Sequence, residues 1–407
     1  MNILSFASRN VYRSGNRSLV TIIAMAFACA MMIVFATLME GFIAGSERNI
    51  VSMNVGDIQI HRQGYRDDPD IYNSITDSST LASSIRKLGF TASERQFAFG
   101  LLASDQSSAG VQLRGIDLNF EPTVTQIDQH LMRGDWLNLA DQHGVVIGKK
   151  LARLLDVSLD DELIFVGQTA DGYMANDAFH VRGILKTVSA SIDNAGVYMS
   201  TEMLRELITL PENAHEIVIM RTDRTGDLVM ATKQVASLAN NELEVMNWQQ
   251  LMPVISRFME TAQIQTFIML LFTYIAVASV VLNAMLMSVF ERINEFGIMK
   301  AIGVRPWQIV QLVYAEIIIH TMLASVIGVI VGVAISWYLQ LHGIDMSSIA
   351  EGISFAGIAM DPIWYAQLST KSLVIPVLFL FVIAFIAVIY PATKVALIRP
   401  LAAIHHR

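Results

Sequence analysis

The chain has 407 residues, 53% of them hydrophobic and 16% charged, and its formal net charge is −8. A typical soluble domain has roughly 25% charged residues, so this composition argues against a soluble enzyme. The acidic balance also excludes a basic nucleic-acid-binding face, and we expect no nucleic-acid partner.

The apolar residues are concentrated in four uncharged runs. Each run exceeds the roughly 18 residues that a helix needs to cross a bilayer, so we expect a membrane protein with four transmembrane α-helices. The first run continues well past Cys29, which favours a retained anchor over a cleaved signal peptide. The runs are Leu19–Met39, Ile264–Phe290, Ile317–Leu341 and Ser372–Thr393, and the helices predicted from them cover residues 18–43, 264–290, 309–341 and 372–393.

The positive-inside rule predicts how these helices are oriented. Basic residues precede the first run, lie between the second and third, and follow the fourth. We therefore expect both termini to be cytoplasmic, with a large domain and a short loop on the other side. Residues 1–17 also have the spacing of an amphipathic helix on the membrane surface, although a charged flank that only sets orientation is the alternative. The cytoplasmic segments are 1–17, 291–308 and 394–407, and the outer segments are 44–263 and 342–371.

The sequence pattern of residues 44–263 differs from that of the apolar runs and predicts a mixed α+β domain of two lobes. They contain 29 acidic and 18 basic residues and several stretches in which apolar and polar residues alternate, as in strands. Near the middle, Leu151, Leu154 and Leu155 share one face of a predicted helix. We expect strands within residues 55–62, 108–117, 145–147, 163–166, 179–185, 195–200 and 215–222, a helix over 201–209, and a polar loop over 63–80.

Two further patterns concern the membrane helices. Residues 247–263 have helical spacing and lead directly into the second run, so one continuous helix is predicted there. In the third run, Gly328 and Gly332 form a G-x-x-x-G pattern, which lets helices approach closely, although small residues are common in membrane helices.

The sequence contains no catalytic or metal-binding pattern. It lacks the G-x-x-x-x-G-K-[ST] loop that binds ATP phosphates, and it also lacks G-x-S-x-G, H-E-x-x-H and C-x-x-C. Cys29 is the only cysteine, and we expect it to be a small buried residue. We therefore expect no enzymatic activity, metal or cofactor on this chain by itself.

Two carboxylates and several methionines adjoin or lie within the apolar runs. Glu40 and Glu316 each lie at the edge of a run, where a carboxylate at headgroup level is the simpler interpretation. Glu316 could instead pair with Arg305 or with a neighbouring helix. Methionine is flexible and suits irregular apolar ligands, so a role in lining a lipid site is a further hypothesis. The candidate substrate-lining residues are Met31, Met32, Phe35 and Met269.

Between the second and third runs the chain reads ERINEFGIMKAIGVRPWQIVQLVYAE, from Glu291 to Glu316. Phe296, Met299 and Ile302 or Gly303 lie at helical spacing among charged residues. Gly303 and Pro306 are expected to break this helix before the next span begins. A short amphipathic helix between two spans can transmit a push from a partner. The alternative is a loop that only reverses the direction of the chain.

This segment resembles the cytoplasmic coupling segment of FtsX-like permeases, the membrane subunits of MacB-type (type VII) ABC transporters. Further stretches resemble the same family in the same order. The one-plus-three arrangement of spans around a large α+β periplasmic domain is the architecture of that family. The matching stretches are GDIQIHRQGY, GVVIGKKLARLLDVSLDDEL, FHVRGIL with AGVYMS, and YPATKVALIRPLAAI, and they are spread over nearly the whole chain.

The resemblance implies a multi-pass permease of the bacterial inner membrane that dimerises with a second copy or a paralogue. It also implies a separate cytoplasmic ABC ATPase that binds ATP and Mg and moves the spans and the periplasmic domain, a mechanism called mechanotransmission. The ATPase-coupling residues implied in this way are Glu291, Arg292, Glu295, Phe296, Gly297, Met299, Lys300 and Gly303.

The resemblance is greatest to the lipoprotein-releasing permeases of the LolC and LolE types, which extract lipidated proteins from the membrane toward a periplasmic carrier. It implies a lipoprotein or another lipid-linked substrate, with membrane lipid and a carrier as further partners. The hook hairpin of the LolC branch contains a proline, whereas the comparable stretch here, Val166–Gly183, has none, so carrier capture is left open.

Two alternatives belong to other classes. One is an FtsX-type transducer that regulates a periplasmic cell-wall hydrolase, although such proteins tend to have a smaller outer domain. The other is MacB-like efflux, although MacB carries its ATPase on the same chain.

Overall fold

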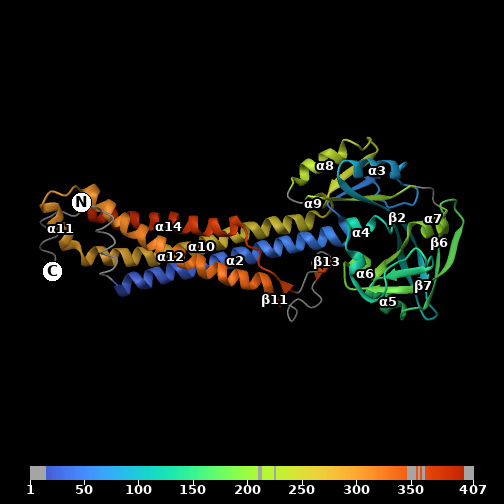
Figure 1. Cartoon of the computed structure of the whole chain (residues 1–407), viewed down its shortest axis with the longest axis horizontal. Helices are drawn as coiled ribbons and strands as arrows, with labels where there is room; N and C mark the ends of the chain where they lie inside the picture. Colours follow the sequence, from blue (N-terminus) through green and yellow to red (C-terminus); the bar gives the residue numbers. More distant parts are fainter. Residues whose placement is uncertain are drawn as a thin grey trace. The chain divides into compact units, whose positions relative to one another are not determined.

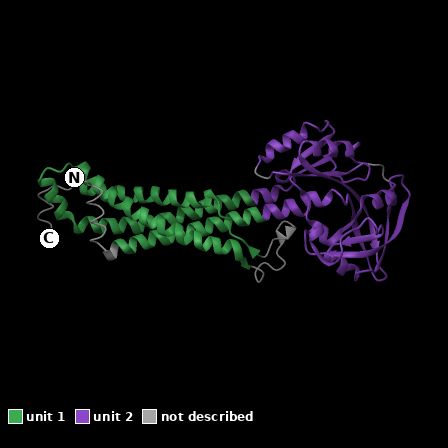
Figure 2. Cartoon of the chain, in the orientation of Figure 1, with its two compact units in different colours: residues 1–45, 259–347, 363–407 green, residues 46–258, 348–362 purple. Residues whose placement is uncertain are grey.

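The computed structural model of the chain describes residues 15–209, 213–223, 226–345, 354–355, 358–359 and 363–397. The chain divides into two compact units, which are coloured separately in Figure 2. Unit 1 comprises residues 1–45, 259–347 and 363–407, and unit 2 comprises residues 46–258 and 348–362. Unit 1 thus holds the apolar runs, and unit 2 holds most of the predicted outer domain.

Four long helices carry the four apolar runs. Among the described residues, these four are long and apolar enough to cross a membrane, as predicted. They extend beyond the uncharged runs because polar residues continue each helix at its ends, and Figure 1 shows them side by side in unit 1. The amphipathic helix predicted over residues 1–17 falls almost entirely outside the described residues. The bounds are α2, Gly15–Ile50; α10, Pro253–Glu291; α12, Pro306–His342; and α14, Thr370–Leu397.

The prediction of one continuous helix over residues 247–263 is wrong, because the helix is interrupted at Met252. Helix α9 (Trp248–Leu251) ends there, and α10 begins at Pro253. A residue before proline is pushed out of the helical region, whereas proline itself suits the first turn of a helix because it has no N–H to pair. Met252 accordingly has a ψ of 64°.

The G-x-x-x-G pattern brings α2 and α12 into close contact. A Cβ atom at Gly328 would lie only 2.8 Å from the Cβ of Cys29, and Gly332 lies against α2 one turn further on. Cys29 is fully buried at this contact, which confirms the packing role expected of it. A buried hydrogen bond of 2.8 Å between the hydroxyls of Thr37 and Ser336 joins the same two helices. Small residues thus let the two backbones approach closely.

Helix α10 packs against α14 through aromatic side chains and one hydrogen bond. Tyr274 is fully buried, and its hydroxyl donates to the carbonyl oxygen of Pro376 over 2.8 Å. The ring of Phe379 lies edge-on to that of Phe267, with their centroids 5.7 Å apart. Polar groups within a helix bundle find their partners on other helices because lipid offers none.

Unit 2 is a mixed α+β domain, as predicted, and ten of its described strands form one sheet. Its other two described strands, β12 and β13, pair with each other. The strand order is β10-β1-β9-β2-β3-β8-β5-β7-β4, and β6 pairs with β2 and β7. The first part of β2 (Phe90–Ala103) pairs with β9, and its later part pairs with β3 and β6. Helices α3 and α8 pack together over β1 and β9, whereas α5 and α7 cover the β3, β7 and β8 region (Figure 1). The domain therefore has two lobes that share the long strand β2.

Most of the predicted strands are confirmed, including those that became β1, β3, β5, β6, β7, β8 and β9. The sequence analysis missed β2, β4, β10, α3 and α8, and the predicted loop over 63–80 ends where α3 begins.

The remaining elements are η1, Val51–Val55; β1, Ile58–Arg62; α3, Ser78–Lys87; β3, Ser108–Ile116; α4, Glu121–Val124; η2, Ile127–Gln129; β4, Leu131–Gly134; β5, Gly144–Ile147; α5, Lys149–Leu155; β6, Glu162–Gln168; β7, Met174–Leu185; α6, Ala190–Ala195; β8, Gly196–Ser200; α7, Thr201–Ile208; β9, Glu216–Arg221; α8, Leu228–Ala236; and β10, Leu243–Asn247. The predicted outer loop over 342–371 contains the short strands β11, Ile344–Asp345; β12, Ser354–Phe355; β13, Ile358–Ala359; and β14, Ile363–Trp364.

A buried ionic network holds the first residues of unit 2 to its sheet. Arg95 on β2 is 2% exposed, and its Nη1 donates to the backbone oxygen of Asn54 in η1 over 2.7 Å. The same guanidinium pairs with Glu121 of α4 and with Glu216 of β9, whose second oxygen lies 3.1 Å from His61 Nε2. One arginine therefore ties η1, which directly follows α2, to α4 and to the sheet.

The contact at Gly328 generates a prediction about unit 1. We expect Gly328→Leu to lower the thermal stability of the full chain in detergent, because overpacking a tight contact costs about 1–3 kcal/mol. The matched control is Val331→Leu, since Val331 lies on the same helix and is 44% exposed. Equal unfolding temperatures for both variants would contradict the close α2–α12 contact.

Acid is expected to weaken the buried network of unit 2 through Glu216. Burial alone would raise the pKa of Glu216, but the hydrogen bond from His61 and the charge of Arg95 lower it from 4.5 to about 2. Such a carboxylate stabilises the fold above its unfolded-state pKa, and this stabilisation is lost as the pH falls toward the folded-state value. We therefore expect the free energy of unfolding to decrease between pH 4.5 and about pH 2.

Denaturant titrations of the full chain in detergent, repeated across this pH interval, measure the effect. Glu216→Gln should be less stable than the native chain near neutral pH and should lose less stability on acidification. Glu242→Gln is the control, because the Glu242 side chain is 70% exposed. The same acid dependence in the native chain and in Glu216→Gln would contradict the role of Glu216.

Candidate functional site

The segment between α10 and α12 folds into the short helix that its spacing predicts. This helix, α11, covers Ile293–Ala301, and α12 begins soon afterwards at Pro306. Gly303 lies between them with a φ of 100°, a left-handed backbone conformation that glycine adopts without strain. The predicted end of the helix near Gly303 is thus confirmed, and only a few residues separate α11 from the next long helix.

Arg292 ties the start of α11 to α12. Its Nη1 donates to Oε2 of Glu316 over 3.1 Å, and its Nε donates to Glu295 over 3.1 Å. The Arg292 and Glu316 side chains are 16% and 6% exposed, and the guanidinium lies 5.2 Å from the ring centre of Phe296. Removing one partner of such a shielded pair leaves an uncompensated charge, which costs about 3–5 kcal/mol in buried examples.

The headgroup-level position of Glu316 stays a prediction. Its side chain is buried, and its partner is Arg292 rather than Arg305. The reason is geometric. Arg305 and Glu316 are separated by eleven positions along α12, or about 16 Å at the helical rise. Glu40 also has a protein partner, because its Oε2 accepts a hydrogen bond of 2.6 Å from the Ser369 hydroxyl.

Lys300 ties the end of α11 to α14. Its Nζ donates to the backbone oxygens of Val395 and Ala396 over 2.8 and 2.9 Å. These carbonyls belong to the last turn of α14, where helix carbonyls have no partner within the helix and the helix dipole is negative. Helix α11 is thus fastened at one end to α12 and at the other end to α14.

The predicted ATPase-coupling residues fall into three environments. The buried residues among them pack beneath α11, so they can position this helix but cannot contact a partner protein. Glu291, Glu295 and Gly303 are exposed; Arg292, Met299 and Lys300 are partly buried; and Phe296 and Gly297 are buried. Their role in ATPase coupling stays a prediction.

Sequence analysis missed the apolar surface of this segment. Ile298, Ile302 and Trp307 are 52%, 79% and 67% exposed. The spacing of Ile298 and Ile302, four residues apart, puts them on the same side of the segment and could have indicated this surface. Large apolar side chains exposed outside the apolar runs make this segment a candidate interaction site.

The candidate substrate-lining residues are divided between the core and the surface of unit 1. Met32 is 3% exposed and Phe35 packs against the same core, whereas Met31 and Met269 are 49% and 52% exposed. Their role in lining a substrate site stays a prediction. Within the described parts of the chain, no group of three or more His, Cys, Asp or Glu could hold a metal ion.

The stretch that we compared with the LolC hook is a β-hairpin of unit 2. Strands β6 and β7 pair antiparallel from Glu162 opposite His180 to Gln168 opposite Met174. Tyr173 and Met174 at its tip are 73% and 77% exposed. The hairpin geometry is therefore present, although the proline is absent.

Two family models match the chain. The model described as MacB-like periplasmic core domain matches residues 18–238, and the one described as FtsX-like permease C-terminal matches residues 267–400. The first covers more than half of the sequence and includes the first membrane helix and most of unit 2. The second includes α11, α12 and α14.

Similar proteins match over parts of their length. The macrolide export ATP-binding/permease protein MacB of Chlorobaculum tepidum is 31% identical over 126 residues, which are 31% of this chain and 16% of that protein. The uncharacterized ABC transporter permease YknZ of Bacillus subtilis is 25% identical over 278 residues, which are 66% of this chain and 63% of that protein. The chain thus covers less than two thirds of the length of either relative.

Among solved structures, the periplasmic region of MacB from Actinobacillus actinomycetemcomitans aligns at 16% identity with a TM-score of 0.37, covering 51% of this chain and 95% of that one. The two family models together account for the single helix before unit 2 and the three helices after it. The chain belongs to the FtsX-like permeases of MacB-type ABC transporters.

Proposed function

We propose that this permease couples ATP hydrolysis by a separate cytoplasmic ATPase to movement of its periplasmic domain, and that it extracts a lipoprotein or another lipid-linked substrate from the inner membrane. The observation that carries the coupling proposal is the double attachment of α11. Arg292 joins it to α12, and Lys300 joins it to α14.

The outward surface of α11 and the following turn supplies the docking site in this proposal. Ile298, Ile302 and Trp307 are exposed, and their apolar side chains gain free energy when a partner buries them. The sequence has no phosphate-binding loop for ATP. A partner that binds ATP and Mg would therefore press on a surface that is connected directly to two membrane helices.

The contacts of α11 support one path for this movement. A displacement of α11 acts on α12 through the Arg292–Glu316 pair and on α14 through Lys300, while α10 is joined to it covalently at Glu291. Hydrogen-bonded charges that are shielded from water resist separation more than solvated ones do. The three helices after the periplasmic domain would then shift together.

Orientation and partners complete the proposal. The basic residues around α11 and beyond α14 favour a cytoplasmic location for this end of the helices, with both termini on the same side. The permease would work as a dimer with a second copy or a paralogue. The lipid-linked substrate is favoured by the apolar methionines Met31 and Met269 on the surface of unit 1, which suit irregular acyl chains.

The ion pair is tested by exchanging its charges. We expect Arg292→Glu and Glu316→Arg, each alone, to reduce substrate-stimulated ATP turnover of the permease–ATPase complex by at least about tenfold, because each leaves two like charges in contact. The double variant should recover a substantial part of the turnover. Lys87→Glu is a control, since Lys87 lies on α3 in unit 2. Failure of the double variant to recover, although both single variants assemble with the ATPase, would contradict the coupling path.

The substrate is tested with the complex reconstituted in nanodiscs. We expect a diacylated lipopeptide to stimulate ATP hydrolysis and to leave the membrane in an ATP-dependent step, whereas the deacylated peptide and a macrolide should do neither. Stimulation by the macrolide alone would favour efflux. Copurification of a cell-wall hydrolase, with no response to lipopeptide, would favour the FtsX-type transducer.

A further inference from the structure

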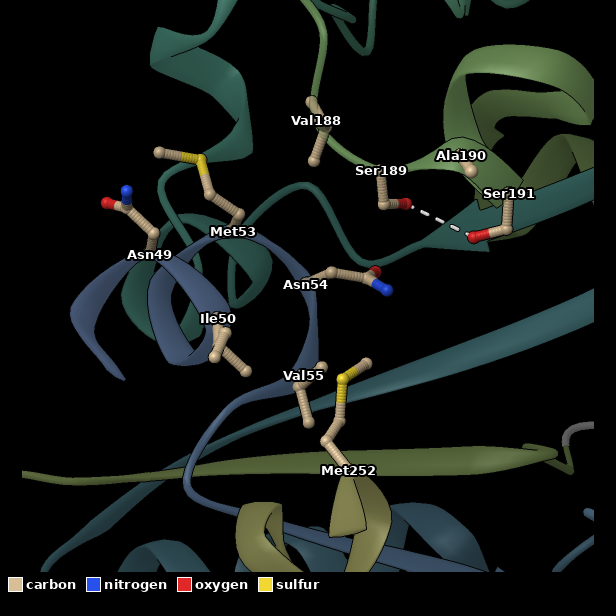
Figure 3. A pocket seen from close by; sticks show the side chains of 10 residues that line it. All are labelled: Asn49, Ile50, Met53, Asn54, Val55, Val188, Ser189, Ala190, Ser191 and Met252. Atoms are coloured by element: carbon tan, nitrogen blue, oxygen red, sulfur yellow. Dashed lines mark hydrogen bonds between the residues drawn. The ribbon is translucent and has the colours of Figure 1, made fainter. Parts of the chain in front are cut away.

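Unit 2 contains a cavity at the point where the chain enters it from α2. The cavity has a volume of about 270 Å³, and Figure 3 shows the side chains around it. Apolar side chains of Ile50 and Met53 come from the end of α2 and from η1, and Met252 comes from the residue just before α10. Ser189 and Ser191 form its polar side, with their hydroxyl oxygens 3.1 Å apart.

A second cavity of about 650 Å³ adjoins the first. It is lined by Phe99 of β2 and by Val111 of β3, and it shares Ala190 and Ser191 with the first cavity. The start of α6 therefore lines both hollows, and the second is the more open of the two. Small-ligand sites have volumes of roughly 300–1,000 Å³, and the two hollows are comparable with the lower and middle part of that range.

A buried arginine orients one amide in each cavity. Arg114 on β3 is 7% exposed, and it donates to Oδ1 of Asn54 over 3.0 Å and to Oε1 of Gln112 over 2.8 Å. Asn54 lines the first cavity and Gln112 lines the second. Because both amide oxygens accept from the guanidinium, the two NH₂ groups are directed away from it and are the donors left for a ligand.

Figure 3 shows the Asn54 side chain pointing from η1 toward the side of the cavity that Ser189 and Ser191 form. The site thus combines apolar walls with fixed N–H and O–H donors. This combination fits a molecule with a long apolar chain and an uncharged oxygen acceptor, such as an ester or amide carbonyl. An acyl chain attached through an ester or amide has both features.

The chain connectivity favours an amphiphile from the bilayer over a water-soluble compound. The apolar helix that can span the membrane continues to Val55, which lines the first cavity. Met252 lies directly before Pro253, where the second such helix begins. The first cavity is therefore lined by the last residues of one membrane-capable helix and by the residue just before another.

We propose that these two cavities form one binding site for an acyl chain and the ester or amide group that carries it. The apolar walls take the chain, and the amides of Asn54 and Gln112 donate to the carbonyl oxygens. This inference rests on the proposed function only for the identity of the occupant. The same chemistry belongs to the lipid anchor of a lipoprotein and to a free phospholipid.

The test uses the full chain in nanodiscs and two photoactivatable probes that carry the same diazirine-labelled acyl chain. One probe is a diacylated lipopeptide and the other is phosphatidylglycerol. We expect cross-links from at least one probe to peptides that contain Met53, Met252 or Val111. Preferential labelling by the lipopeptide identifies a lipid anchor as the occupant, and equal labelling by both identifies a membrane acyl chain in general.

Three variants test the location. Ser191→Trp introduces a bulky side chain where one residue lines both cavities, and Met252→Trp introduces one into the first cavity from a different part of the chain. Because two positions are tested, a folding defect in one variant does not decide the result. Each should lower labelling of these peptides at least about tenfold, or 1.4 kcal/mol in binding free energy. Met230→Trp should leave it unchanged, because Met230 lies on α8 and is 64% exposed. Absence of labelling in the native chain, or unchanged labelling in both filled variants, would overturn the site.

The site and the proposed function can fail separately. ATP-dependent release of lipopeptide without cross-links to the cavities would overturn the site and leave the function. Cross-links without release would support the site and overturn extraction as the function.

Discussion

The ion pair between Arg292 and Glu316 is the interaction on which the proposed coupling depends. A charged segment between two apolar helices must leave the bilayer, yet its arginine reaches back to a carboxylate that is almost fully buried on the following helix. Such a pair is costly to break, because separation leaves a shielded charge without a partner. The pair therefore holds α11 against α12 more firmly than a contact between solvent-exposed side chains would.

Lys300 provides the second attachment of α11, because it holds the other end of this helix to the last carbonyls of α14. Unit 2 has a comparable feature at the far end of the first long helix. There Arg95 binds the backbone of η1 and two carboxylates of the domain. In each unit, one or two buried or partly buried cations thus join a membrane helix or its direct extension to the elements next to it. The acyl-chain site that we propose is built around the same η1 segment.

The membrane architecture could be predicted from the sequence because lipid imposes one simple requirement, a long run without charges. The close helix approach at Gly328 and the turn at Gly303 could also be predicted, because glycine allows backbone contacts and conformations that other residues do not, although the sequence did not identify Cys29 as the partner of Gly328. Strand β2 was missed because its middle carries Glu94 and Arg95, which look exposed in a sequence, whereas Arg95 is buried by carboxylates from distant elements.

The same limit applies to the candidate site. Local spacing predicted α11, but it could not identify Glu316 as the partner of Arg292, since the two residues belong to different helices. The spacing of Ile298 and Ile302 puts them on one side of the segment, but it does not say whether that side is buried or exposed. The cavities near η1 depend on residues from six separate parts of the chain, and no local pattern marks them.

The central claim is that α11 and α12 move as one piece when the ATPase works. A distance measured between spin labels at Asn294 on α11 and Val331 on α12 tests it most directly, with one labelled permease copy in each complex. Both positions are exposed, and Asn294 lies outside the proposed docking surface. The account predicts the same narrow distance distribution in the nucleotide-free and vanadate-trapped complexes, and a broad one in Glu316→Gln. A distance that shifts between the two nucleotide states of the native complex would contradict it.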